Sequence, residues 1–278
     1  MTRAPGPTHP AAARSADAYS AYFRALGRSF RLPFVADNLA TCIVVWVLLC
    51  IGTFIKTYGG CFGSIGAIII TGWYWSFLFG TVLNSAGGEE DLPKVTLTGG
   101  LTDDVIVPLL KMLLTLAIAC LPLTVFMLLD ALLDGGMGTL LVGGAGSLPQ
   151  LRDIAGSTIL LLLLMLGLFT WPMLLLVIAA GSMESVLRLD LIAATIFRSF
   201  GAYVIAVLAV YACVAVMIIA AFVMPDTTGP VWIGAGAGRA AVQGAAFQLV
   251  TLYLAIFAMR AIGLHYHCFK HKYAWSWG

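Results

Sequence analysis

The most metal-like residues of this chain are three histidines and a cysteine near its C-terminal end. They form the pattern His265-x-His267-Cys268-x-x-His271. On a helix, His267 and His271 share one face at i, i+4, while His265 and Cys268 share another at i, i+3. Zinc needs three or four ligands that converge on one point. We therefore favour a basic, aromatic helix end that grips the membrane, keep these four residues as weak candidate ligands, and expect no cofactor.

A second cluster with chemical potential is the acidic run Glu89-Glu90-Asp91, which Leu92 and Pro93 follow. Three adjacent carboxylates on a loop could bind a divalent cation or a basic segment of a partner. Neighbours in a loop point in different directions, however, and no oxygen-ligand spacing of the DxDxDG type follows. We favour a solvated turn on the cytoplasmic side.

Motifs for nucleophilic catalysis or phosphate binding are missing from the sequence. HExxH, GxSxG and GxxxxGK[ST] do not occur. The charged residues Lys111, Asp130 and Arg260 fall near the ends of apolar segments, where long side chains normally reach the membrane surface. No acidic residue falls near the middle of such a segment, which argues against a proton-coupled pump. We do not expect an enzyme.

The composition predicts that these residues belong to a multi-pass membrane protein. The chain is 61% hydrophobic and 10% charged, whereas soluble domains carry about 25% charged residues. The net charge of +2 gives no basic face for nucleic acid. A spanning helix needs about 20 apolar residues, and six segments qualify: Asn38–Ile55, Cys61–Leu83, Val105–Leu129, Ile154–Gly181, Ala202–Met224 and Ala241–His265.

The distribution of positive charge predicts how the chain is threaded. With both termini in the cytoplasm, twelve of the fifteen lysines and arginines lie inside, and only Lys56, Arg152 and Arg239 lie outside. The fold is thus expected to be an all-α, polytopic transmembrane helix bundle in the bacterial inner membrane. We expect a disordered N-terminal tail over residues 1–17, a six-helix domain over 18–266 and a basic aromatic tail over 267–278.

The six spans are organised as three hairpins, each preceded by a short cytoplasmic segment. These segments start near Ala18, Gly100 and Met183. Arg28-Ser29-Phe30 recurs as Arg198-Ser199-Phe200, each time just ahead of the next span. The recurrence indicates either an internal duplication or a chance similarity of basic, aromatic flanks, and the sequence leaves both open.

The first and third of these segments have the pattern of amphipathic helices. Apolar residues fall at helical spacing in both, as Tyr19, Tyr22, Phe23, Leu26 and Phe30, and as Val186, Ile192, Ile196 and Phe197. We expect both helices to lie in the headgroup plane, with their positive residues toward the phosphates of an anionic inner leaflet. The predicted lipid contacts are Arg24, Arg28, Arg31, Arg188 and Arg198.

Two further features concern packing between the spans. Gly236, Ala240 and Gly244 recur every four residues at the entry to the sixth span, a pattern that favours close helix packing within the chain or with a partner. Pro122 and Pro172 lie inside the third and fourth spans. Transporters build binding sites from broken helices, but prolines are also tolerated as simple kinks, which we favour here.

The Gly88–Pro93 turn and the segment Met259-Arg260-Ala261-Ile262-Gly263-Leu264-His265-Tyr266 through Trp275 resemble an uncharacterised family of bacterial six-span membrane proteins, itself distantly similar to the Yip-type proteins. The resemblance could cover residues 20–275. It implies a topology and an absence of obvious catalysis. The additional Glu90 and the histidine-rich tail depart from that pattern.

Two functions follow as hypotheses. The first is a non-catalytic membrane component, namely a scaffold, assembly or membrane-organising subunit of a larger complex, whose partners are the anionic inner leaflet and other membrane subunits. The alternative is a transporter or channel for a small or lipidic substrate, which predicts a midplane cavity lined by Thr115, Thr124, Thr158 or Thr170.

Overall fold

The computed structural model describes residues 10–94, 100–134, 149–181, 183–223 and 237–273. Within these ranges the chain is helical and forms no strand. Six of its helices are long and apolar enough to cross a membrane, which confirms the predicted all-α, polytopic class. The helices are α1 Pro10–Ser29, α2 Ala36–Tyr58, α3 Gly60–Gly87, α4 Val107–Asp134, α6 Pro149–Ala180, α7 Leu189–Arg198, α8 Phe200–Val223 and α9 Ala237–Phe269.

Short helical turns connect or end several of these elements. They are η1 Leu32–Phe34 before α2, the π-helical turn η2 Thr102–Ile106 before α4, η3 Met183–Leu187 before α7, and η4 Lys270–Lys272 after α9. The spans pack as the expected sequential hairpins, α2 with α3, α4 with α6, and α8 with α9. Pro122 and Pro172 lie inside continuous α4 and α6, so neither proline breaks its helix in two.

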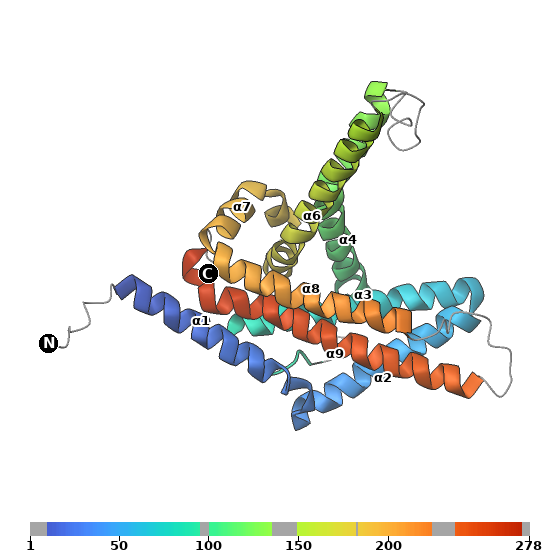
Figure 1. The fold of residues 1–278 in the computed structure, drawn as a ribbon. Coiled ribbons are helices and arrows are strands. Elements are labelled where there is room, and N and C mark those ends of the chain that lie inside the picture. Colours follow the sequence, from blue (N-terminus) through green and yellow to red (C-terminus); the bar gives the residue numbers. More distant parts are fainter. Residues whose placement is uncertain (1–9, 95–99, 135–148, 182, 224–236, 274–278) are drawn as a thin grey trace.

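Helix α9 is the centre of the bundle, with contacts to α3, α8, α1, α2 and α6 (Figure 1). Its approach to α3 is closest at Gly263. A methyl group added there would collide with the carbonyl oxygen of Val82 and lie 2.6 Å from Cβ of Ser85. A glycine at this position therefore allows the two backbones to meet.

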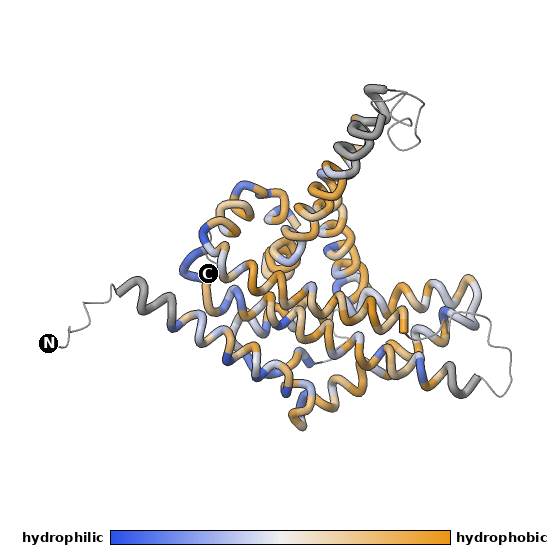
Figure 2. Tube along the Cα trace, viewed as in Figure 1, coloured by the Kyte–Doolittle hydropathy of each residue, from blue (hydrophilic) through white to orange (hydrophobic). Residues whose placement is uncertain are grey.

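The α4–α6 hairpin joins this bundle through one end only. The last turns of α6, Met173–Ala179, are buried on every face, and α6 contacts α3, α8 and α9. Away from this end, Figure 1 shows the hairpin diverging from the other spans. Several leucines in this diverging part of the hairpin are exposed, and Leu161 and Leu162 are more than half exposed. Such side chains suit contact with lipid tails (Figure 2).

The two amphipathic segments form helices, but much of each apolar stripe packs on the protein. In α1, Tyr22 is fully buried against the end of α9, and Tyr19 packs on Phe269 with ring centroids 5.0 Å apart. Before and within α7, the residues Val186, Ile192 and Ile196 are buried in the main core. At those positions the apolar stripe is covered by the bundle itself, while the prediction that the positive residues face the phosphates concerns the opposite side of each helix.

Both ends of the described chain lie on the same side of the bundle, as an even number of spans requires. Lys272 Nζ lies 5.7 Å from the ring centroid of Tyr19, which brings η4 onto α1. Helix α1 begins at Pro10, within the segment 1–17 assigned from the sequence to the N-terminal tail. Helix α9 continues past residue 266 to Phe269, into the expected C-terminal tail.

Candidate functional site

At the end of the bundle where η4 meets α1, several buried polar groups lie around the turn that follows α3. Gly88 ends the helix with φ +88°, and its N–H donates to the Ser85 carbonyl while Glu89 N–H donates to the Asn84 carbonyl at 2.8 Å. This pair of bonds is a Schellman cap, which favours glycine because of the positive φ. A side chain at Gly88 would also collide with the ring of His267. The helix cap and the contact with His267 therefore fix the position at which the acidic run Glu89-Glu90-Asp91 begins.

The chain after Gly88 turns back along α3 instead of leaving the bundle. Leu92 is buried, and Pro93 lies against Gly80, where an added methyl group would be 3.0 Å from the proline Cβ. Asn38, at the start of α2, binds the segment that returns along α3. Its Oδ1 accepts from Leu92 N–H at 2.8 Å, and its Nδ2 donates to the carbonyls of Leu32 at 3.2 Å and Glu90 at 3.4 Å.

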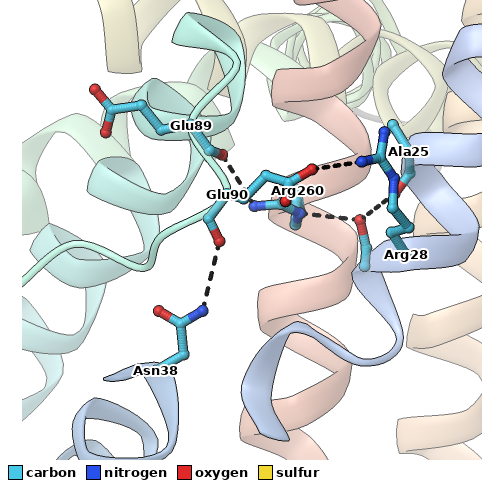
Figure 3. Close-up of polar contacts among 7 residues, drawn as sticks. Ala25, Arg28, Asn38, Glu89, Glu90 and Arg260 are labelled. Carbon is cyan, nitrogen blue, oxygen red and sulfur yellow. Dashed lines mark hydrogen bonds and ion pairs between the residues drawn. The ribbon is translucent and has the colours of Figure 1, made fainter. Parts of the chain in front are cut away.

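Arg260 of α9 completes the arrangement. Its side chain is 3% exposed, so the expectation that it extends to the membrane surface was wrong. Nε donates to Ser29 Oγ at 2.9 Å, and a terminal nitrogen donates to the Glu89 carbonyl at 3.3 Å (Figure 3). Ser29 in turn donates to the Ala25 carbonyl at 2.9 Å. A buried guanidinium needs such acceptors because desolvation of the charge is costly.

We call Arg28, Ser29, Asn38, Glu89, Glu90 and Arg260 the Arg260 cluster. Its outer part is the ion pair between Arg28 and Glu90 Oε1 at 2.8 Å, in which both side chains are more than 60% exposed. The Glu89 and Asp91 side chains are exposed as well, and the Glu89 carboxylate points away from Arg260 (Figure 3). The carboxylates thus face outward, while the backbone of the turn binds the arginine.

Further hydrogen bonds fix α1 along the last turns of α9. Tyr22 Oη donates to the Ala261 carbonyl at 3.2 Å, and Tyr253 Oη donates to the Phe30 carbonyl at 3.0 Å. Burial, with a smaller contribution from the nearby Cys268, raises the pKa of Tyr22. The phenol therefore stays protonated and able to donate. The cluster and these two tyrosines together join α1, the start of α2, the turn after α3, and α9.

All five predicted lipid-contact arginines are exposed, although their helices pack on the bundle. Arg24 donates to the Ser20 carbonyl at 3.2 Å within α1, and Arg28 pairs with Glu90. Arg31, Arg188 and Arg198 form no ion pair with other described residues. The five positions can therefore meet lipid phosphates, and their role as lipid contacts stays a prediction.

The histidines and the cysteine of the C-terminal pattern have different surroundings. His265 is buried in an aromatic cluster with Tyr203 and Phe269, and its Nδ1 lies 2.7 Å from Tyr273 Oη. His267 is exposed, with Nδ1 3.3 Å from the Ala86 carbonyl, and His271 is also exposed. Cys268 is a partly buried free thiol. Across the described residues, no three histidine, cysteine or carboxylate side chains come together to hold a metal.

The predicted packing stripe of Gly236, Ala240 and Gly244 lies mostly outside the residues whose side chains the structure describes. Gly236 is not described, and for Ala240 only the helical backbone is. A methyl group added at Gly244 would meet no described atom within 4 Å. Close helix approaches occur instead at Gly63, Gly72, Gly167 and Gly263, beside backbone atoms of Ile55, Val105, Ala119 and Val82. Packing through the predicted stripe remains a prediction.

Three of the four threonines proposed to line a transport path are bonded within their own helices. Thr115 donates to the Met112 carbonyl at 2.7 Å, and Thr170 to the Gly167 carbonyl at 3.0 Å. Thr124 does the same to Leu121. These hydroxyls already have acceptors, so a substrate would gain little from donors at these positions.

Comparison with known proteins adds no relative. No protein-family model, no curated protein and no solved structure matches the chain. The resemblance to six-span and Yip-type proteins therefore stays an expectation from short motifs. Function has to be argued from the arrangement itself.

Proposed function

We propose that this chain is a non-catalytic integral membrane protein that acts as a scaffold or membrane-organising subunit. The observation that carries the proposal is the Arg260 cluster. It uses a buried arginine, a serine and an asparagine to hold backbone and neighbouring elements rather than a ligand. Fully satisfied polar networks of this kind rigidify a protein and specify one arrangement.

The arrangement that the cluster holds favours contact with an anionic surface. Helix α1 lies fixed along α9, with Arg24 and Arg28 exposed, and Arg188 and Arg198 at the two ends of α7 are exposed as well. Fixed positive groups next to apolar spans attract anionic headgroups. Partner subunits would bind the open apolar surface of the spans through helix packing. The transporter alternative has less support, because Thr115, Thr124 and Thr170, three of the four threonines named for it, are bonded within their helices.

The proposal is tested with two triple variants that lose the same charge. Arg24, Arg188 and Arg198 are replaced by glutamine in one, and Lys56, Arg152 and Arg239 in the other. Each basic residue near an anionic surface contributes about 1 kcal/mol, so the first variant should retain several-fold less phosphatidylglycerol than the unchanged protein. The measurement is the ratio of phosphatidylglycerol to phosphatidylcholine that co-purifies from mixed vesicles.

The second variant is the matched control and should keep the original lipid ratio. An unchanged ratio in the first variant would contradict the proposed lipid contact. An equal decrease in both variants would also contradict it, because the attraction would then follow total charge and not the predicted side of the membrane.

A further inference from the structure

An apolar groove lies between α2, α8 and α9, next to η1. Its volume is about 430 Å³, and its lining includes Leu39, Ile43 and Trp46 of α2, Val216 of α8 and Tyr253 of α9. That volume falls in the range of roughly 300–1,000 Å³ typical of small-molecule sites. The groove is therefore large enough for a ligand, while its walls offer almost no polar surface.

The polar atoms beside the groove already have partners. Trp46 Nε1 donates to the Ala245 carbonyl at 2.8 Å, and Tyr253 Oη donates to the Phe30 carbonyl at 3.0 Å. A polar ligand would find no unused donor in these two side chains and would lose its own hydration. The groove thus favours hydrocarbon.

A basic residue, Arg31, directly precedes the η1 residues that line the groove. Pro33 and Phe34 of η1 line the groove, and Phe34 N–H donates to the Arg31 carbonyl at 3.0 Å. Arg31 is exposed and, in the described part of the chain, forms no ion pair, whereas Arg28 is paired with Glu90. An apolar groove with an exposed arginine one turn of chain from its lining complements a molecule that has a hydrocarbon chain and an anionic head.

We propose that the groove binds one acyl chain of an anionic phospholipid, with the phosphate at Arg31. This inference rests on the proposed lipid contact and narrows it to a single bound molecule. The arginine can bond phosphate oxygens at two points. Because bulk lipid tails are as apolar as the walls of the groove, the preference for one lipid comes from this head-group contact. The lipid would fill the space between α2 and α9 next to the Arg260 cluster.

Native mass spectrometry of the purified protein with added phosphatidylglycerol or phosphatidylcholine tests this proposal. We expect one retained phosphatidylglycerol per chain. Leu39→Trp should fill the groove and lower that occupancy about tenfold, and Ile43→Phe provides a second groove-filling variant. Val47→Trp is the matched control, because Val47 lies on α2 with the same 42% exposure as Leu39 but does not line the groove. Arg31→Gln should lower the preference for phosphatidylglycerol over phosphatidylcholine about fivefold.

Three results would overturn the proposal. The first is equal occupancy in Leu39→Trp, Ile43→Phe and Val47→Trp, which would place any retained lipid elsewhere. The second is a dimer that the groove-filling variants dissociate, which would make a second copy the occupant. The third is a groove-dependent ligand that shows no preference for the anionic head. Neither groove-filling variant alters an arginine. If these variants did not lower the lipid occupancy, the triple-variant test of the proposed function would be unaffected.

Discussion

Replacing Arg260 with leucine should lower the free energy of unfolding by about 3 kcal/mol, because hydrogen bonds from a charged donor contribute about 1.5–3 kcal/mol each. Arg260 makes two such bonds, to Ser29 Oγ and to the Glu89 carbonyl; after the substitution the Ser29 hydroxyl would stay behind buried and the Glu89 carbonyl partly buried. The lost desolvation cost of the charge offsets part of the loss. Thermal unfolding of the purified protein in detergent measures the change.

The same substitution should also loosen α1. Trypsin would then cleave after Arg28 faster than in the unchanged protein, since α1 would lose its bond to α9 at Ser29. Arg198→Leu is the control, because this exposed arginine at the end of α7 should change stability by no more than about 0.5 kcal/mol. Ser29→Ala should be costly alone and nearly neutral when combined with Arg260→Leu. Additive effects, or cleavage unchanged by Arg260→Leu, would contradict the structural role given to this arginine.

The second large effect is expected at Gly263. Alanine there would collide with the Val82 carbonyl and with Cβ of Ser85 at 2.6 Å, so α3 and α9 must separate. Overpacking of this kind costs about 1–3 kcal/mol. Unfolding in detergent at increasing denaturant measures this loss.

Gly244→Ala on the same helix is the matched control for Gly263→Ala. An added methyl group at Gly244 meets no described atom within 4 Å, so the substitution should be neutral or stabilise α9 by up to about 1 kcal/mol. If Gly263→Ala were as well tolerated as Gly244→Ala, the close approach of α3 and α9 would be wrong. If Gly244→Ala alone were destabilising, the predicted packing stripe would gain support.

The six spans could be predicted from the sequence because the bilayer sets a minimum length of apolar helix, which local composition reveals. Periodicity also identified the apolar stripes of α1 and α7, but it gives only the face of a helix and not what covers that face. Tyr22 and Ile192 would look the same against lipid or protein. Their burial in the protein depends on where α9 and α8 lie, which is a long-range property.

The Arg260 cluster could not be predicted for the same reason. Arg260 has the sequence position of a residue that reaches the membrane surface, but the end of α1 at Ser29 and the return of the chain after Gly88 both bind it. One local signal did point to the cluster. In the repeated Arg-Ser-Phe motif, Ser29 and Ser199 are both buried and both donate to the carbonyl four residues earlier, so the serine makes the same hydrogen bond in both places.

We propose that this chain works as a subunit of a membrane assembly. The most direct test is the mass of the particle that it occupies after gentle solubilisation of its native membrane, with every co-migrating protein identified. We predict a particle of fixed composition, much larger than the 29.5 kDa chain. A lone monomer or homo-oligomer that moves a solute across liposome membranes would contradict the claim and favour transport.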